Sequence, residues 1–374
     1  MMSKAKMKSE MHNDRQTRRT SPYKTILTTD EKKDLKLFYS YDPSRCKEEI
    51  RRTIRRRRFR LVQRTVCYAA ILLAAFLTVG ITLHLHQLQK KEAEIDLSKI
   101  ESGSPKAVLE LPSGETLALE DEQDGVIANL DEVTIRKNSD FIAYDLQDIK
   151  LEQSTAQQTA VINKIFIPRG GEYKVCLADG TEVWLNAGSE LTYPAKFNHH
   201  SRTVHLDGEG YFVVAKSDVP FVVATRDMDI TVLGTRFNVS SYADDGQTSV
   251  TLEEGSVKAT ASNGEQFLLT PGDRLSINSQ TGNSEATTVD PRNYTAWKDG
   301  TFVFCDEPIQ SIARKLSRWY NVDFIPDDNL NIHFTGTIHR YESILSMIEV
   351  LELTGEIKCL VGKDAIRLIP GELP

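Results

Sequence analysis

The Gly234-Thr235 dipeptide places a threonine hydroxyl next to the carbonyl of the preceding residue, a spacing that allows cleavage of the chain. Gly234 stands directly before Thr235 in Val232-Leu-Gly-Thr-Arg-Phe-Asn-Val239. A threonine hydroxyl held close to the preceding carbonyl carbon can attack it, which moves the acyl group from nitrogen to oxygen and leads to chain cleavage. The alternative interpretation needs no chemistry, because a glycine here permits a bend or bulge in a strand. Both interpretations stay open on these residues alone.

Acidic residues offer a second kind of chemistry, since paired carboxylates can hydrolyse a glycosidic bond. The candidates are Asp179, Glu209 and the Glu253–Glu254 pair. Asp179 and Glu209 flank turn glycines and the pair precedes Gly255, where Asp and Glu are ordinary turn residues. We therefore favour structural roles for these carboxylates over a hydrolase.

Histidines suggest a metal site, but their pattern favours a solvated surface. His199 and His200 fall in a polar turn. His205 lies between Val204 and Leu206, so strand alternation turns the two apolar side chains inward and the histidine outward. We predict no metal and no cofactor.

The remaining motif classes also argue against an enzyme. The sequence contains no phosphate-binding loop, nucleophile elbow or metal-ligand spacing. Its cysteines are far apart, without a CxxC pair, and their odd number outside the N-terminal part predicts mostly buried thiols rather than a disulfide framework. They are Cys46, Cys67, Cys176, Cys305 and Cys359.

The charge distribution divides the chain into two parts. Residues 1–64 carry 20 Lys/Arg and 8 Asp/Glu, a net charge of +12. The remainder carries 46 − 20 = 26 basic and 53 − 8 = 45 acidic residues, a net charge of −19. Such a contrast predicts two different environments.

An uncharged segment separates these parts. Residues 65–89 contain no Asp, Glu, Lys or Arg, and the apolar centre from Val66 to Leu83 is long enough to cross a hydrocarbon core. No small-residue cleavage site follows it, so we predict an uncleaved transmembrane helix over 65–87 rather than a signal peptide. Arginines crowd its N-terminal side, which predicts a cytoplasmic N-terminus, contact with anionic lipid rather than nucleic acid, and a single-pass inner-membrane protein.

The cytoplasmic segment, residues 1–64, offers little apolar surface of its own. Two short helices are predicted, one with Leu35 and Phe38 and one with Ile50 and Ile54. A segment that cannot bury its own apolar face tends to need a partner. The alternative is a tail that serves only to orient the protein in the membrane.

The outer portion changes to the two-residue period of strands after a polar linker, 88–106. Short strands separated by Gly-containing turns predict an all-β antiparallel sandwich or jelly-roll-like domain over 107–292. Within it, the strand-turn-strand pattern from Leu109 to Leu119 aligns without a gap on that from Val175 to Leu185. Residues 293–374 predict a separate small α+β domain with the order β-α-β-β-α-β-β.

Six strings in this outer portion closely resemble the FecR family of transmembrane anti-sigma factors, and the resemblance covers roughly residues 105–370. The last string resembles a C-terminal module of Bacteroidetes members, similar to the secretin/TonB short N-terminal fold. The strings are Pro168-Arg-Gly-Gly-Glu-Tyr173, Leu177-Ala-Asp-Gly-Thr-Glu-Val-Trp-Leu-Asn186, Leu206-Asp-Gly-Glu-Gly-Tyr-Phe-Val213, Val232-Leu-Gly-Thr-Arg-Phe-Asn-Val239, Tyr294-Thr-Ala-Trp-Lys-Asp-Gly300 and Leu316-Ser-Arg-Trp-Tyr-Asn-Val322.

The resemblance implies how such a protein works. The cytoplasmic part would bind an extracytoplasmic-function sigma factor, here through Leu35, Phe38, Ile50 and Ile54. The periplasmic domains would receive a signal from the signalling domain of a TonB-dependent outer-membrane receptor, with Trp319 and Tyr320 as candidate contacts. Some members cleave themselves at the Gly-Thr of the motif that holds Gly234 and Thr235. Periplasmic and intramembrane proteases would then release the cytoplasmic part, and the output would be genes for uptake of iron chelates or glycans.

The N-terminal part departs from the family pattern. Members usually carry a longer helical cytoplasmic domain with tryptophans, whereas Trp184, Trp297 and Trp319 all follow the predicted span. The alternative function is an anchored periplasmic glycan-binding or scaffold protein, which would bind saccharide directly and leave transcription unchanged.

Overall fold

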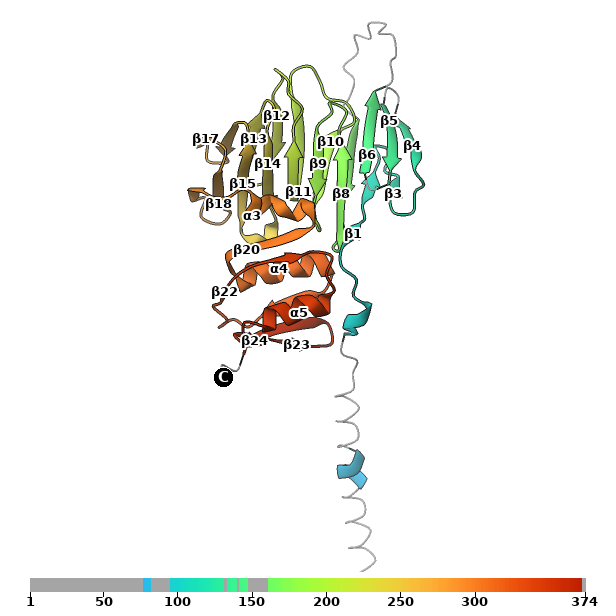
Figure 1. Ribbon diagram of the computed structural model, residues 1–374. Helices are drawn as coiled ribbons and strands as arrows, with labels where there is room; N and C mark the ends of the chain where they lie inside the picture. The colour runs from blue at the N-terminus through green and yellow to red at the C-terminus, as the bar shows by residue number, and fades with distance from the viewer. Residues whose placement is uncertain (1–76, 82–94, 131–132, 140, 147–160, 372–374) are drawn as a thin grey trace, which may run out of the picture. The chain divides into compact units, whose positions relative to one another are not determined.

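The computed structural model describes residues 77–81, 95–130, 133–139, 141–146 and 161–371 (Figure 1). The chain divides into two compact units, residues 1–90 and 91–374. In the first unit, 77–81 are helical, and the rest of the predicted span and of the cytoplasmic segment lie outside the described residues. Among the described residues, no helix is both long and apolar enough to cross a membrane.

The second unit begins with a sandwich of two β-sheets. In the first sheet the strands follow the order β3-β2-β7-β10-β11-β12-β13-β16-β17. They are β2 (Val108–Glu110), β3 (Thr116–Ala118), β7 (Ile162–Phe166), β10 (Glu190–Pro194), β11 (Arg202–Val213), β12 (Phe221–Ala224), β13 (Met228–Val232), β16 (Val257–Ala261) and β17 (Gln266–Leu269).

The second sheet follows the order β4-β5-β6-β8-β9-β11-β14-β15-β18-β19. A two-residue strand, β1 (Ser104–Pro105), pairs with β8 in parallel. The other strands are β4 (Gly125–Leu130), β5 (Val133–Asn138), β6 (Phe141–Leu146), β8 (Gly171–Cys176), β9 (Glu182–Leu185), β14 (Arg236–Ser241), β15 (Gln247–Glu254), β18 (Asp273–Asn278) and β19 (Ser284–Thr288).

The path of the chain corrects the prediction of an antiparallel, jelly-roll-like sandwich. The mostly β character is confirmed, but β6 pairs with β8 and β11 pairs with β12 in parallel. The chain forms one to three strands in one sheet, crosses to the other, and advances along the sandwich with each crossing. A jelly roll instead wraps long hairpins around the whole barrel. Other pairs whose strands are separated by a visit to the other sheet, such as β7–β10, β13–β16 and β15–β18, are antiparallel.

Strand β11 belongs to both sheets. The sequence pattern predicts two strands, Thr203–Leu206 and Tyr211–Ala215, with turn glycines between them, whereas the structure has one strand from Arg202 to Val213. Gly208 takes a φ of +101°, and a Cβ there would lie 2.6 Å from the Cα of Ser189. Glycine is therefore required where the strand passes from the first sheet to the second.

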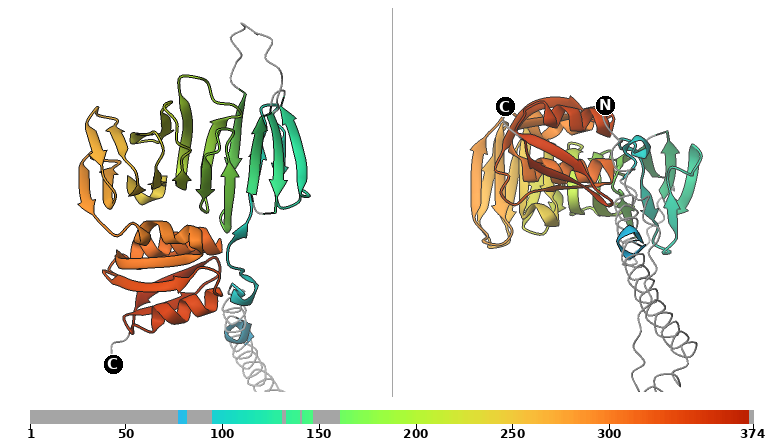
Figure 2. Two further views of the ribbon diagram at one scale, coloured as in Figure 1. Left: turned by 45° about the horizontal axis from the view of Figure 1, so that its top comes forward. Right: turned by 90° about the horizontal axis from the view of Figure 1, so that it is seen from below.

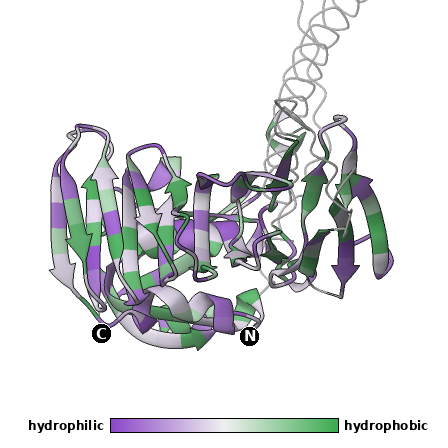
Figure 3. Ribbon diagram, turned by 90° about the horizontal axis from the view of Figure 1, so that it is seen from above, coloured by the Kyte–Doolittle hydropathy of each residue, from purple (hydrophilic) through white to green (hydrophobic). Residues whose placement is uncertain are grey.

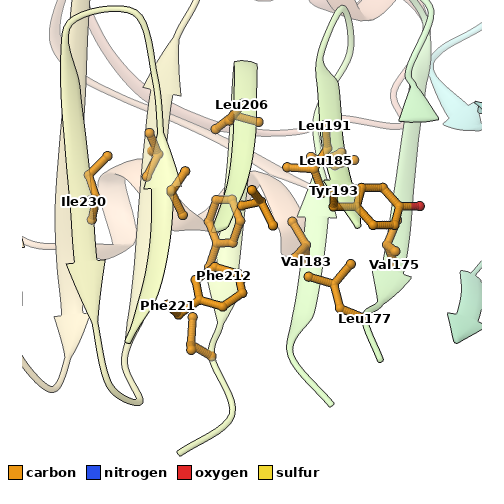
Figure 4. Close-up of a cluster of buried hydrophobic side chains, with 14 of the residues drawn as sticks. Val175, Leu177, Val183, Leu185, Leu191, Tyr193, Leu206, Phe212, Phe221 and Ile230 are labelled. Carbon is orange, nitrogen blue, oxygen red and sulfur yellow. The ribbon is translucent and has the colours of Figure 1, made fainter. Parts of the chain in front are cut away.

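Apolar side chains from both sheets fill one core. Hydrophobic and hydrophilic residues alternate along the strands in Figure 3, as expected for sheets with one buried face. Figure 4 shows side chains from strands β8 to β13 pointing toward one another between the sheets. Phe212 of β11 stacks on Phe237 of β14 with ring centroids 5.2 Å apart.

The same tight turn occurs in three hairpins of the sandwich. In the β2–β3 hairpin, Leu111 N–H donates to Glu115 O and Gly114 N–H to Leu111 O; β8–β9 repeats both bonds from Leu177 and Gly180. The β16–β17 hairpin repeats them again from Ala261 and Gly264. The three glycines have φ values of +83°, +82° and +87°. The self-similarity read from the sequence is thus a repeated hairpin, with a third copy that the sequence comparison missed.

A small α+β module follows the sandwich after α3 (Arg292–Thr295) and η3 (Ala296–Asp299). Figures 1 and 2 show it as a lobe beside the ends of the sandwich strands. Its predicted element order is confirmed, with β20 paired to β22 and β24 lying between β21 and β23. The elements are β20 (Thr301–Pro308), α4 (Ile309–Tyr320), β21 (Asp323–Pro326), β22 (His333–His339), α5 (Ile344–Glu352), β23 (Ile357–Val361) and β24 (Ala365–Pro370).

Candidate functional site

A buried arginine, Arg340, lies where the module meets the sandwich. It directly follows β22, its N–H donates to Gly300 O, and the residue is only 1 % exposed. Its guanidinium carbon is 3.7 Å from the ring centroid of Trp319 and 5.1 Å from that of Phe302. Aromatic faces attract a desolvated cation, so these rings stabilise a charge that burial alone would disfavour.

The same guanidinium reaches across to the sandwich. Nη2 donates to Asn186 Oδ1 at 2.6 Å, and Nη1 donates to Trp297 O at 2.7 Å and to Glu172 Oε2 at 3.2 Å. Burial lowers the pKa of Arg340, and the carboxylate of Glu172 opposes this effect. An arginine keeps its charge under such conditions, and its planar fork can donate in several directions at once.

Glu209 is the second centre of this network. Its carboxylate accepts from the side-chain amides of Asn186 at 2.8 Å and Asn238 at 2.9 Å. The indole N–H of Trp297 then donates to Asn238 Oδ1 at 3.0 Å. Asn186, directly after β9, and residues of β11 and β14 thus present one chain of polar groups to Trp297 and Arg340. We call the set Glu172, Asn186, Glu209, Asn238, Trp297, Trp319 and Arg340 the clamp.

A second arginine joins the two parts beside the clamp. The guanidinium carbon of Arg318, on α4, lies 3.8 Å from the ring centroid of Tyr242. Its nitrogens donate to both oxygens of Asp245 and to Asp244, within 3.1–3.3 Å. Tyr242 O–H donates to Ala187 O at 2.8 Å, and burial raises the pKa of this phenol. The phenol therefore remains a neutral platform for the arginine.

A third arginine belongs to the sandwich and bonds to the α+β module. Arg169, in the loop before β8, donates through Nη2 to Ser317 O at 2.7 Å and to Asp323 at 2.6 Å. The N–H of the next residue, Gly170, donates to Arg318 O at 2.7 Å. The sandwich and the module therefore each contribute at least one arginine that bonds to the other.

The arrangement is suited to holding two domains together. Removing one member would leave a desolvated partner charge without compensation, which is costly in a protein interior. A cavity of about 50 Å³ lies beside Asn186, Glu209, Trp297 and Arg340. Among the described residues, no group of three His, Cys, Asp or Glu side chains is placed to hold a metal ion.

The six strings that carry the family resemblance contribute most of these contacts. Arg169 and Glu172 come from the first string, Asn186 from the second and Glu209 from the third. The remaining strings supply Asn238, Trp297, Arg318 and Trp319. Of the clamp residues, only Arg340 lies outside the strings. Its neighbours in the sequence do not mark it, because its partners are far away along the chain.

Gly234 and Thr235 lie in a bend between β13 and β14. A Cβ on Gly234 would meet Lys216 Cα at 2.9 Å, so the close approach of Lys216 requires glycine. Thr235 is 5 % exposed, and its hydroxyl donates to Ser256 O at 3.0 Å. Gly255, with φ +99°, packs against both the Thr235 hydroxyl and Gly234 O. The bend expected from glycine is present, and the hydroxyl is held in a defined position beside it.

The carboxylates considered for hydrolysis have structural partners. Asp179 pairs with Arg202 at 2.8 Å, and Glu253 accepts from Tyr211 O–H at 2.6 Å. Glu209 belongs to the clamp and lies within β11 rather than in a turn, which corrects that prediction. His199, His200 and His205 are exposed, as predicted for a solvated surface.

The two candidate receptor contacts are core residues of the module. Trp319 is 1 % and Tyr320 is 2 % exposed. Trp319 Nε1 donates to Arg340 O at 2.6 Å, and Tyr320 O–H donates to Glu342 O at 2.9 Å. Neither side chain is presented to a partner in this conformation, because aromatic residues on the inner face of α4 complete the core. The candidate sigma-factor contacts Leu35, Phe38, Ile50 and Ile54 lie outside the described residues.

Comparison with known proteins identifies both parts of the second unit. The FecR protein family matches residues 163–258, and the family described as FecR, C-terminal, matches residues 301–368. A search of the curated proteins finds no match.

Two crystal structures of a proposed anti-sigma factor from Parabacteroides distasonis ATCC 8503, at 1.65 and 2.50 Å, are similar to the chain. Both are 29 % identical to it with a TM-score of 0.53. The similarity covers 56 % and 57 % of this chain and 99 % and 100 % of theirs. Residues 163–258 thus belong to a FecR domain and residues 301–368 to a FecR C-terminal domain, and the clamp residues join the two.

Proposed function

We propose that the chain is a single-pass inner-membrane anti-sigma factor that relays a signal to an extracytoplasmic-function sigma factor. The observation that carries the proposal is the 29 % identity to the proposed anti-sigma factor over essentially that chain's whole length. Together with the two family matches, it supports a regulatory role.

The charge pattern supports the direction of the relay. The arginine-rich residues before 65–87 favour a cytoplasmic N-terminus, and the acidic remainder would lie in the periplasm. In the resting state, residues 28–64 would fold on the sigma factor and cover the surface with which it binds polymerase. Engagement of a TonB-dependent receptor would act on the periplasmic domains, followed by proteolysis or rearrangement. The controlled genes would serve uptake of iron chelates or glycans.

The clamp gives the periplasmic part a way to act as one body. Three arginines, Arg169, Arg318 and Arg340, connect the FecR domain to the C-terminal domain. A receptor that binds either domain would therefore shift the other unless these pairs break. A ligand moves such an equilibrium only through its different affinities for the two states.

Co-purification from membranes tests the proposal. The full-length chain, tagged at its C-terminus, should recover a sigma factor, and deletion of residues 28–64 should abolish that recovery. A matched control deletes residues 2–20, which lie in the polar N-terminal stretch, and should recover the sigma factor normally. Equal recovery of the sigma factor after both deletions would exclude residues 28–64 as the binding site. Failure to recover a sigma factor with the full-length chain or either variant would contradict the proposal.

A further inference from the structure

The residues that lead into the sandwich run along the C-terminal domain first. Ile95, Leu97 and Ile100 are partly buried and pack against the core of that domain. Ile95 N–H donates to Gly362 O at 2.9 Å, at the end of β23. Between them, Leu97–Lys99 form one 3₁₀ turn, η1, whose N-cap is Asp96. We call residues 95–105 the strap.

The strap then passes over the clamp. Gly103 is buried, and a Cβ at this position would overlap the six-membered ring of Trp319. Ser104 N–H donates to Gly170 O at 3.1 Å, and Ser104–Pro105 pair with Gly171 and Glu172 of β8. The strap therefore contacts the same indole that carries Arg340, and the same loop that carries Arg169.

The folded conformation of the strap therefore depends on its contacts with the C-terminal domain. Its apolar side chains and its first backbone hydrogen bond go to that domain, although Ile95 and its partner Gly362 are 362 − 95 = 267 positions apart in the sequence. If the domain moved away from the strap, Ile95, Leu97 and Ile100 would lose their packing and the 3₁₀ turn would lose its support. A three-residue turn is not stable without such tertiary contacts.

Protection from proteolysis follows from this dependence. The side chain of Lys99 is 81 % exposed, but its backbone is part of the turn, with Lys99 N–H bonded to Asp96 O and Ile100 N–H to Leu97 O. A protease must draw several residues into an extended conformation, so cleavage follows the population of the locally opened state. Exposure of one side chain is therefore not sufficient for cleavage at Lys99.

We propose that the strap is a latch: the C-terminal domain keeps residues 95–105 folded and protects the Lys99–Ile100 peptide bond, and displacement of that domain exposes it to proteolysis. Cleavage is a hydrolysis in which water adds across the bond, leaving a carboxylate on Lys99 and an amine on Ile100. The role of the latch in signalling rests on the proposed function, whereas the protection itself does not.

Limited digestion of the full-length chain in detergent micelles with trypsin tests the latch. The readout is the fragment that begins at Ile100, followed by mass spectrometry, because the basic N-terminal segment will be cut independently. Gly103→Ala places a methyl group against the Trp319 ring and should release the strap, raising the rate at which this fragment appears at least tenfold. Gly80→Ala is the matched control, because nothing lies within 4 Å of a Cβ there.

A second variant keeps the test independent of the tryptophan. Ile95→Ser with Leu97→Ser removes apolar packing without adding charge near the cleaved bond, and should also raise the rate at least tenfold. Thermal unfolding of each variant establishes that the sandwich and the C-terminal domain still fold. Rates that match the wild type in both variants would overturn the latch, as would wild-type cleavage at Lys99 as fast as in the denatured chain.

The outcome also separates the two proposals. Recovery of a sigma factor together with unchanged digestion rates would leave the proposed function in place and refute the latch. Protection of the Lys99–Ile100 bond without recovery of any sigma factor would support the latch and refute the proposed function.

Discussion

The guanidinium of Arg340 lies 3.7 Å from the ring centroid of Trp319, and the indole N–H of Trp319 donates to the carbonyl of Arg340 itself. Each residue thus fixes the other. Gly103 of the strap packs against the same indole, and Asn186 and Glu172 of the sandwich accept from the same guanidinium. Three segments that are remote in sequence therefore meet at one pair of side chains.

Replacement of Arg340 by alanine should destabilise the assembly of the two domains. The change leaves Glu172 without its arginine and removes the cation from Trp319, which we expect to cost about 3–5 kcal/mol of unfolding free energy. Arg340→Lys should lose much of the same energy, because a single ammonium cannot reproduce the bonds to Asn186, Trp297 and Glu172. Thermal unfolding of the full-length chain in detergent measures both.

Arg367→Ala is the control for this experiment. Arg367 is exposed on β24 of the same domain, so its loss should change the unfolding free energy by no more than about 0.5 kcal/mol. An Arg340→Ala variant as stable as Arg367→Ala would show that the clamp does not hold the domains together.

Local patterns in the sequence predicted the β2–β3, β8–β9 and β16–β17 hairpins and the α+β order. The Asp179-Gly180 turn and the apolar face of α4, including Ile312 and Leu316, depend on residues only a few positions apart. Such short-range signals are read directly from the period of the apolar residues.

Long-range geometry was not predictable in the same way. Arg340 bonds to Glu172 across 168 positions, and nothing next to Arg340 marks it as buried. Strands β4, β5 and β6 were not predicted. In β5, Arg136 and Lys137 interrupt the apolar alternation, and the structure pairs them with Asp145 and Asp124. The crossing of β11 between sheets was read as a turn because Gly208 and Gly210 suggest one in the absence of partner strands.

The three repeated turns predict a common cost for losing their glycines. Gly114→Ala, Gly180→Ala and Gly264→Ala should each lower the unfolding free energy by about 1 kcal/mol, because a left-handed backbone disfavours a Cβ while no atom lies within 4 Å. Gly208→Ala should cost about 3 kcal/mol or more, since overpacking against Ser189 adds to the backbone strain. Chemical denaturation compares the four, and equal costs at all four positions would contradict this account of β11.

Cys359 should react slowly with alkylating reagents at neutral pH. Burial, assisted by the charge of Glu352, raises the pKa of this thiol to about 12. Because the thiolate is the reactive form, deprotonation is shifted to higher pH, and the labelling rate should rise about tenfold for each pH unit between 8 and 10. Mass spectrometry after brief iodoacetamide treatment measures the rate, with urea-unfolded chain as the reference. Labelling of Cys359 at pH 8 as fast as in the unfolded chain would contradict the burial.

Self-cleavage at Gly234–Thr235 is expected if the held hydroxyl is used. Thr235 Oγ1 would attack the Gly234 carbonyl carbon, the peptide C–N bond would break to free the Thr235 amine, and water would hydrolyse the resulting ester. The purified chain should then contain a fragment that begins at Thr235, and Thr235→Ala should abolish it while Thr235→Ser retains it. An intact wild-type chain after prolonged incubation would leave Thr235 with its bond to Ser256 as a structural role only.

Transcript profiling of a deletion strain tests the central claim of signal relay most directly. Loss of an anti-sigma factor frees its sigma factor, so a limited set of genes that share one promoter sequence should change, an outer-membrane receptor gene among them. Restoration of the full-length chain should reverse the change, whereas the chain lacking residues 28–64 should not. An unchanged transcript profile, together with direct saccharide binding by the full-length protein, would contradict the relay and favour a glycan-binding role.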